Sequence, residues 1–209
     1  MFRDRDQAGT KLGEALRTRD WWRPLVLGIA RGGVPVGAAL ARTIGAELDV
    51  VVARKVGAPG QPEFGVAAVT AHGPVVESEA FPEVTWRPGE FDRACAQERN
   101  TALRREHRYH GADETTDRTG RDVLLVDDGL ATGITATAAL RAERNRGPRR
   151  LVLAVPVASV TAARCLRPET DEVFCLARPT DFSAVGQYYE RFDQVADAEV
   201  TALLRDTGN

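Results

Sequence analysis

Short apolar segments alternate with helical stretches along this chain, and this alternation constrains the fold more than any other feature. The segments expected as strands lie at residues 25–30, 49–53, 123–128, 151–157 and 173–177. Their apolar residues are consecutive, as in strands that are buried on both faces. Helices are expected over about 6–17, 34–44, 134–146 and 160–167, with Ser159 as the N-cap of the last one. The pattern predicts an α/β fold with a mostly parallel central sheet and helices on both faces.

Composition sets the outer limits of this prediction. A length of 209 residues fits a single domain over 1–209, and 43% hydrophobic residues are enough for a packed core. The net charge of −2 gives no general reason to expect a nucleic acid or a membrane as partner. We find no run of 18 apolar residues and no secretory signal, and Cys95, Cys165 and Cys175 show no metal-binding spacing. A cytoplasmic protein is therefore expected.

The segment from Val123 to Thr135 contains the most specific chemical signal. Four apolar residues lead into two adjacent carboxylates, Asp127 and Asp128, and a loop of small residues then opens a helix. Backbone N–H groups at the start of a helix attract anions, and glycine lets a phosphate approach the backbone. Two carboxylates beside such a loop suit sugar hydroxyls or a cation. The segment therefore predicts a sugar phosphate as ligand.

This segment resembles the phosphoribosyl diphosphate (PRPP) motif of type I phosphoribosyltransferases, with four hydrophobic residues, two acids, a short spacer and Thr-Gly-x-Thr. The resemblance implies a type I phosphoribosyltransferase fold with a small hood, for which residues 178–192 are the candidate. It also implies an Mg²⁺-dependent enzyme of nucleotide metabolism, in which PRPP gives its ribosyl 5-phosphate group to a nucleobase or an amine and diphosphate leaves. Enzymes of this kind often form homodimers.

The resemblance assigns roles to individual residues. Asp127 and Asp128 hold the ribose hydroxyls, directly or through Mg²⁺ and water, and are the catalytic candidates that stabilise positive charge on the ribose ring. The 5′-phosphate is bound by the loop residues Ala131, Thr132, Gly133, Ile134 and Thr135. Related enzymes commonly carry an aspartate at the position of Ala131 when they act on 6-oxopurines, so a hypoxanthine or guanine substrate is disfavoured. Phe182 is the candidate for stacking on the base, weighed equally against a role in the core.

Basic residues follow two other expected strands. Arg31, Gly32 and Gly33 come after the strand 25–30, and the resemblance makes them the diphosphate loop. If that strand adjoins the strand 123–128, both loops face one ligand beyond the carboxyl ends of the sheet. Lys55 is assigned to the diphosphate as a catalytic residue, with Arg54 as the weaker candidate. A flexible loop is expected over about 57–74, with 57–62 irregular because of its glycines and prolines.

A second function stays open beside catalysis. The long polar helix expected over 90–110 has a basic part at 99–110, which suits a non-catalytic PRPP or nucleotide sensor that binds nucleic acid. His107 and His110 are spaced to share a metal ion on one helix face, but the sequence offers no third ligand. A solvated helix face is the favoured interpretation of this segment, and nucleic acid is the less favoured partner.

Overall fold

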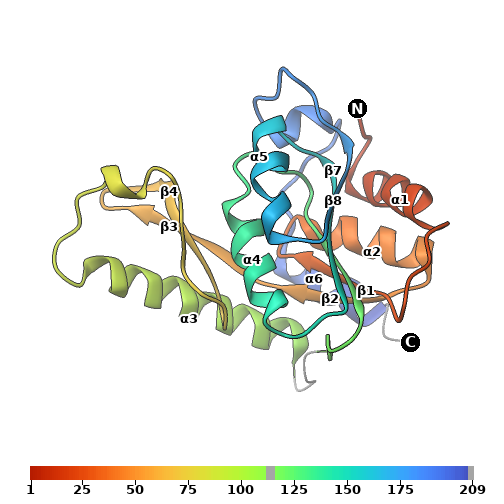
Figure 1. The fold of residues 1–209 in the computed structure, drawn as a ribbon, viewed down its shortest axis with the longest axis horizontal. Coiled ribbons are helices and arrows are strands. Elements are labelled where there is room, and N and C mark those ends of the chain that lie inside the picture. The colour runs from red at the N-terminus through yellow and green to blue at the C-terminus, as the bar shows by residue number, and fades with distance from the viewer. Residues whose placement is uncertain (112–115, 207–209) are drawn as a thin grey trace.

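A parallel sheet forms the centre of the protein, as Figure 1 shows for the computed structural model. The structure describes residues 1–111 and 116–206. Within this part of the chain the sheet has five strands in the order β2-β1-β6-β7-β8, and each neighbouring pair is parallel. The strands are β2 (Glu47–Val51), β1 (Leu25–Ile29), β6 (Asp122–Val126), β7 (Arg150–Val157) and β8 (Glu172–Ala177). The predicted parallel α/β sheet is confirmed.

Helices cover both faces of this sheet because its strands alternate their buried side chains between two cores. One core joins Val26 and Leu124 to α1 (Arg5–Leu16), α2 (Gly33–Ile44) and α6 (Asp197–Asp206). The other joins Leu27 and Leu125 to α4 (Ile134–Arg144) and α5 (Val160–Cys165). Short 3-10 turns lie at Phe81–Glu83, Arg167–Glu169 and Val185–Tyr188. Every predicted helix and strand named above has its counterpart here, with ends that differ by a few residues.

The first helix lies directly on the second because two glycines remove side chains from the contact. A Cβ atom at Gly9 would lie 2.1 Å from the carbonyl oxygen of Val36, and one at Gly13 would lie 2.4 Å from Cβ of Thr43. Gly9 lies near Val36 and Gly13 near Thr43, so the contact advances along both helices in the same direction. This packing places Arg5, the first residue of α1, beside the residues that open α2.

An arm projects from the central sheet, at the left of Figure 1. It consists of the antiparallel strands β3 (Ala53–Ala58), β4 (Gln61–Thr70) and β5 (Val76–Glu77), together with the long helix α3 (Glu90–His110). The predicted helix 90–110 is confirmed. The prediction of an irregular segment at 57–62 was wrong, because residues 57–58 end β3 and residues 61–62 begin β4. Gly60, with a φ of 71°, makes the tight turn between the two strands.

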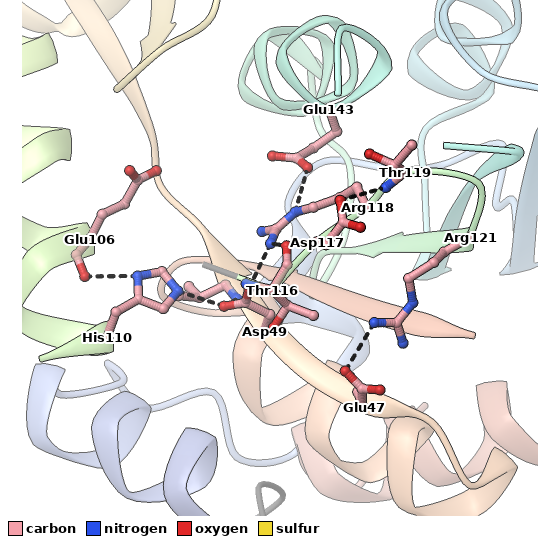
Figure 2. Close-up of polar contacts among 11 residues, drawn as sticks. Glu47, Asp49, Glu106, His110, Thr116, Asp117, Arg118, Thr119, Arg121 and Glu143 are labelled. Carbon is pink, nitrogen blue, oxygen red and sulfur yellow. Dashed lines mark hydrogen bonds and ion pairs between the residues drawn. The ribbon is translucent and has the colours of Figure 1, made fainter. Parts of the chain in front are cut away.

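Buried charges fasten the end of α3 to the sheet, as drawn in Figure 2. Asp49 of β2 accepts hydrogen bonds from Nε2 of His110 at 2.6 Å and from Nη1 of Arg118 at 2.9 Å. Arg118 also donates to Glu143 of α4 at 3.1 Å, and its side chain is only 1% exposed. With His110 charged, two positive side chains, Arg118 and His110, thus balance the carboxylates of Asp49 and Glu143 inside the protein.

His110 is positively charged in this arrangement. Its two ring nitrogens face acceptors, the carbonyl oxygen of Glu106 at 3.0 Å and the carboxylate of Asp49, so both carry a proton. The hydrogen bond with Asp49 raises the pKa of His110, against the effect of partial burial. Burial alone would raise the pKa of Asp49, but His110 and Arg118 hold it at about 2. The solvated-face interpretation was therefore wrong for His110, whereas His107 is exposed as expected.

Candidate active site

The two acidic residues lie at the carboxyl edge of the sheet, beside the loop that follows β1. Gly28 of β1 is opposite Val126 of β6, so the segments after both strands are neighbours. A Cβ atom at Gly32 would lie 2.1 Å from Oδ2 of Asp128, and one at Gly33 would lie 2.3 Å from the carbonyl oxygen of Val126. The two glycines are thus required because the loop and the acidic residues approach so closely.

The acidic residues share an environment with little solvent. Asp127 accepts a hydrogen bond from the backbone N–H of Asp128 at 2.9 Å, and the side chain of Asp128 is 14% exposed. Burial raises the pKa of both carboxyl groups, and the charge of Asp128 raises that of Asp127 further. The positive charges of Arg5 and Lys55 act in the opposite direction on Asp127. A cation bound here would therefore meet carboxylates whose charges are only partly compensated.

Arg5 is a residue of the site that the sequence did not reveal. Its Nε and Nη2 atoms both lie 2.8 Å from Oδ2 of Asp128, and its Nη1 donates to the carbonyl oxygen of Asp193 at 2.7 Å. The guanidinium lies 3.9 Å from the centre of the Phe192 ring. The Gly9 and Gly13 spacing, which brings α1 onto α2, is the sequence signal that could have located Arg5 here.

The predicted phosphate loop forms the start of α4. Gly133 has a φ of +81° and is the N-cap of the helix, a conformation that favours glycine. Ala131 and Thr132 are exposed, and Ser159 Oγ donates to the carbonyl oxygen of Ala131 at 2.9 Å. The first N–H groups of a helix have no partner within it, so those of residues 133–135 suit a phosphate. Ser159 also caps α5 as predicted, by accepting from Ala162 N.

A cavity of about 530 Å³ joins several of these residues. Arg31 and Gly32 line it on one side, with Asp128 and Arg5 next to them. The remaining lining comes from the C-terminal part of the chain, at Val185, Phe192, Asp193, Gln194 and Val195. The structure therefore brings the predicted diphosphate loop and one predicted acidic residue around one space. Val185 and Phe192 belong to the hood candidate 178–192, whereas nothing in the sequence alone indicated that residues 193–195 take part.

The two basic residues after β2 have different surroundings. Lys55 is exposed on β3, and its positive charge acts to lower the pKa of Asp127. Arg54 is the neighbour along the same strand, and its Nε lies 2.8 Å from Glu98 of α3. Successive side chains of a strand point to opposite faces. Lys55 therefore stays the candidate for the diphosphate, whereas the assignment of Arg54 to it is not retained.

The hood candidate contacts the acidic residues through a tyrosine. Tyr189 donates its hydroxyl to the carbonyl oxygen of Asp128 at 2.6 Å. The ring of Phe182 stacks on Tyr188, with 5.6 Å between ring centres and 20° between their planes. The stacking of Phe182 on a base therefore stays a prediction.

The donors at this site fit a magnesium ion that shares its ligands with a phosphate substrate. Within residues 1–111 and 116–206, no group of three or more His, Cys, Asp or Glu could hold a metal ion. Mg²⁺ at such sites is held by one or two carboxylates, with water and substrate oxygens completing the shell. Asp127 and Asp128 supply that number.

No helix in the described part of the chain is long and apolar enough to cross a membrane.

Comparison with known proteins gives consistent matches over the chain. The phosphoribosyl transferase domain family matches residues 6–192. Rv0571c of Mycobacterium tuberculosis, provisionally named a phosphoribosyl transferase, is 38% identical over 98% of this chain and 46% of its own length. The chain thus spans about half the length of this curated relative.

Two solved structures are also similar. TT1426 from Thermus thermophilus is 45% identical, with a TM-score of 0.83 over 100% of this chain and 99% of that one. AQ2163 from Aquifex aeolicus shares the fold, at 12% identity and a TM-score of 0.51, over 85% of this chain and 77% of that one.

Proposed function

We propose, from the premise that the chain belongs to the phosphoribosyl transferase domain family, that it moves the ribosyl 5-phosphate group of PRPP to a nitrogenous acceptor and releases diphosphate. One observation carries the proposal. The acidic residues Asp127 and Asp128 lie between a phosphate-type loop on one side and the Arg31 loop on the other, at the ends of adjacent parallel strands. Ligands of open α/β sheets bind at such a position.

Each part of the site suits one part of PRPP. The N–H groups at the start of α4 and the hydroxyls of Thr132 and Thr135 bind the 5′-phosphate. Asp127 and Asp128 accept hydrogen bonds from the ribose hydroxyls. These carboxylates would also hold Mg²⁺, which would supply positive charge near the diphosphate. Arg31 and Lys55 stabilise the negative charge that builds up on the leaving diphosphate.

The attacking group is a nitrogen atom of the acceptor, for which we propose a nucleobase. The ribose carries positive charge as the bond to diphosphate breaks, and the acidic residues below it stabilise that charge. Water competes for the same carbon atom, so the site must exclude it. We propose the hairpin of β3 and β4, which carries Lys55, as the element that covers the ligand. The expected homodimer is a further proposal, testable by light scattering.

Calorimetry of PRPP binding, with Mg²⁺ and with a chelator, tests the proposal. We expect micromolar binding that needs Mg²⁺ and is lost in the double variant Asp127→Asn/Asp128→Asn. A thermal melt of the variant separates loss of ligand from loss of fold. Wild-type protein that binds no PRPP would contradict the proposal. If PRPP binds, release of diphosphate is then measured with each nucleobase in turn.

The alternative of a nucleic-acid-binding sensor gains no support from α3. Arg99 donates to the carbonyl oxygens of Thr70 and Gly73, at 3.0 and 2.7 Å. Arg108 pairs with Asp197 at 3.0 Å. These arginines serve contacts within the protein, so the basic part of the helix is less available to a phosphate backbone than its sequence indicates.

A further inference from the structure

We propose that Arg5 is an exchangeable counter-ion, which an incoming diphosphate draws away from Asp128 and which thereby opens Asp128 to the ribose hydroxyls. This inference rests on the proposed function, since it concerns how the same site recognises its ligand. It adds a specificity-determining residue from α1 to a site otherwise built from the loops after β1 and β6. The ligand it selects is a sugar that carries a diphosphate, in preference to a sugar phosphate without one.

Arg5 and Gly32 both lie against Oδ2 of Asp128. Two nitrogen atoms of Arg5 lie 2.8 Å from this oxygen. Gly32 is also so close to this oxygen that a Cβ atom there would lie 2.1 Å from it. The side chains of Arg5 and Asp128 are 12% and 14% exposed. A ribose hydroxyl or a cation therefore reaches this oxygen only after Arg5 has moved.

Arg5 has a second place to bind an anion. It lines the cavity of about 530 Å³ together with Arg31, so two arginine side chains border one space beside Gly32. Nη1 of Arg31 lies 3.9 Å from Asp197, so its present ion pair is a long one. A guanidinium is a planar set of donors that binds phosphate oxygens in pairs. A diphosphate has more charge and more acceptor oxygens than one carboxylate. It can therefore compete with Asp128 for Arg5.

The contacts that remain would support Arg5 in either position. The carbonyl oxygen of Asp193 and the ring of Phe192 hold the guanidinium without neutralising its charge. Asp128 supplies the charged contact, and this is the contact that a diphosphate replaces. The exchange therefore replaces the ion pair of Arg5 with Asp128 by one with the diphosphate. The contacts of Arg5 with Asp193 and Phe192, which join α1 to the C-terminal segment, stay in place.

The exchange couples the two halves of the ligand. Inorganic diphosphate gains a contact from Arg5, whereas ribose 5-phosphate must displace Arg5 from Asp128 without offering a diphosphate in return. Removing the guanidinium therefore changes the two affinities in opposite directions. A purely structural role for Arg5 predicts that both affinities fall together, because the whole site would loosen.

The test is calorimetric titration of wild type and Arg5→Gln with inorganic diphosphate and, separately, with ribose 5-phosphate, at one fixed Mg²⁺ concentration. We expect diphosphate to bind about tenfold more weakly to the variant, the worth of one hydrogen bond to a charged group. We expect ribose 5-phosphate to bind more tightly, by about threefold or more on the same scale. Shifts of the same sign, or no shift, would overturn the inference.

Matched variants complete the test. Arg191→Gln removes an exposed arginine that pairs with Asp4 on the same side of the molecule, and it should change neither affinity. In the Asp128→Asn background, Arg5→Gln should no longer increase the affinity for ribose 5-phosphate. If Arg5→Gln is unfolded at the assay temperature, Arg5→Lys should give smaller shifts of the same two signs. A wild type that binds neither PRPP nor either fragment would instead reject the proposed function, and the inference with it.

Discussion

At the scale of single residues, glycine is needed at positions 32 and 33 because neighbouring atoms lie too close for a side chain, and not because the turn is unusual. Gly32 has an ordinary φ of −61°, but its Cα lies against the carboxylate of Asp128. Gly33 lies against the backbone carbonyl of Val126. A carboxylate can turn away from an added methyl group, whereas a strand carbonyl cannot move without moving the strand. The two positions should therefore respond differently to alanine.

We predict that Gly32→Ala weakens PRPP binding with little effect on stability. The added methyl group displaces Asp128, one of the two carboxylates that we propose to contact the ribose. Gly33→Ala should instead lower the free energy of unfolding by about 1–3 kcal/mol, as overpacking does. Urea denaturation and PRPP calorimetry of both variants check this. Equal losses of stability in the two variants would contradict it.

The residues that the sequence located are those whose roles are encoded locally. Asp127, Asp128 and the loop to Thr135 form one continuous motif, so their types and spacing were enough. Arg5 lies 123 positions from Asp128, in an arginine-rich chain where no local pattern distinguishes it. Only the packing of α1 on α2 brings it to the site. Phe192, at the end of the hood candidate, lines the same cavity, and its ring lies against the Arg5 guanidinium.

At the scale of elements, the contact between α1 and α2 sets the position of Arg5. We predict that Gly9→Ala lowers the free energy of unfolding by about 1–3 kcal/mol, because the new Cβ meets the carbonyl oxygen of Val36 at 2.1 Å. It should also weaken diphosphate binding, since α1 carries Arg5 with it. Thr10→Ala, one position along, should stay within about 0.5 kcal/mol. Denaturation and titration of both variants measure this, and a Gly9→Ala variant that binds diphosphate like wild type would contradict it.

The attachment of α3 should make stability depend on pH. His110 has a raised pKa in the folded protein, so its contribution is complete below its unfolded pKa of about 6.5 and declines as pH rises through the higher folded value. Asp49 has a lowered pKa of about 2, so its contribution is present at neutral pH and is lost as pH falls toward 2. We predict that wild type loses stability from about pH 6.5 upward and that His110→Gln loses less. Denaturation curves from pH 6 to 9 test this, and parallel slopes for the two proteins would be the contrary result.

The strands of the central sheet were predictable because burial on both faces produced consecutive apolar residues. The prediction failed at residues 57–62, where the strands are not buried in this way. The first four residues of β4 are exposed, and they include Pro62 and Glu63. Their pairing with β3 is irregular, with register shifts near Gly57 and Ala58. Backbone hydrogen bonds hold this end of the hairpin, and such bonds place few constraints on which residue types occur there. The glycines and prolines therefore indicated a loop where two strands meet.

At the scale of the whole molecule, the arm is joined to the central sheet at the end of α3 and also at α4. Ala68 and Val76 of the arm pack against Ile134 and Ala138 of α4, the helix that begins at the phosphate loop. We predict that PRPP with Mg²⁺ slows amide hydrogen exchange in residues 57–64, because Lys55 would be drawn to the diphosphate. Peptides from β7, already deep in the sheet, serve as the control. Unchanged exchange at 57–64 under saturating PRPP would show that the hairpin does not cover the ligand.

The contacts of Asp128 with Arg5 and Tyr189 have a consequence for the order in which the site is built during translation. Arg5 is made first, the acidic residues and the phosphate loop follow, and Tyr189 to Asp193 come last. At about 5–20 residues per second, the ribosome delivers the loop several seconds before the segment that holds Arg5 in place. During that interval the nascent chain carries the proposed phosphate loop without the segment that holds Arg5. Selective recognition of a ligand can begin only when the last of the three parts has left the exit tunnel and folded back onto the first.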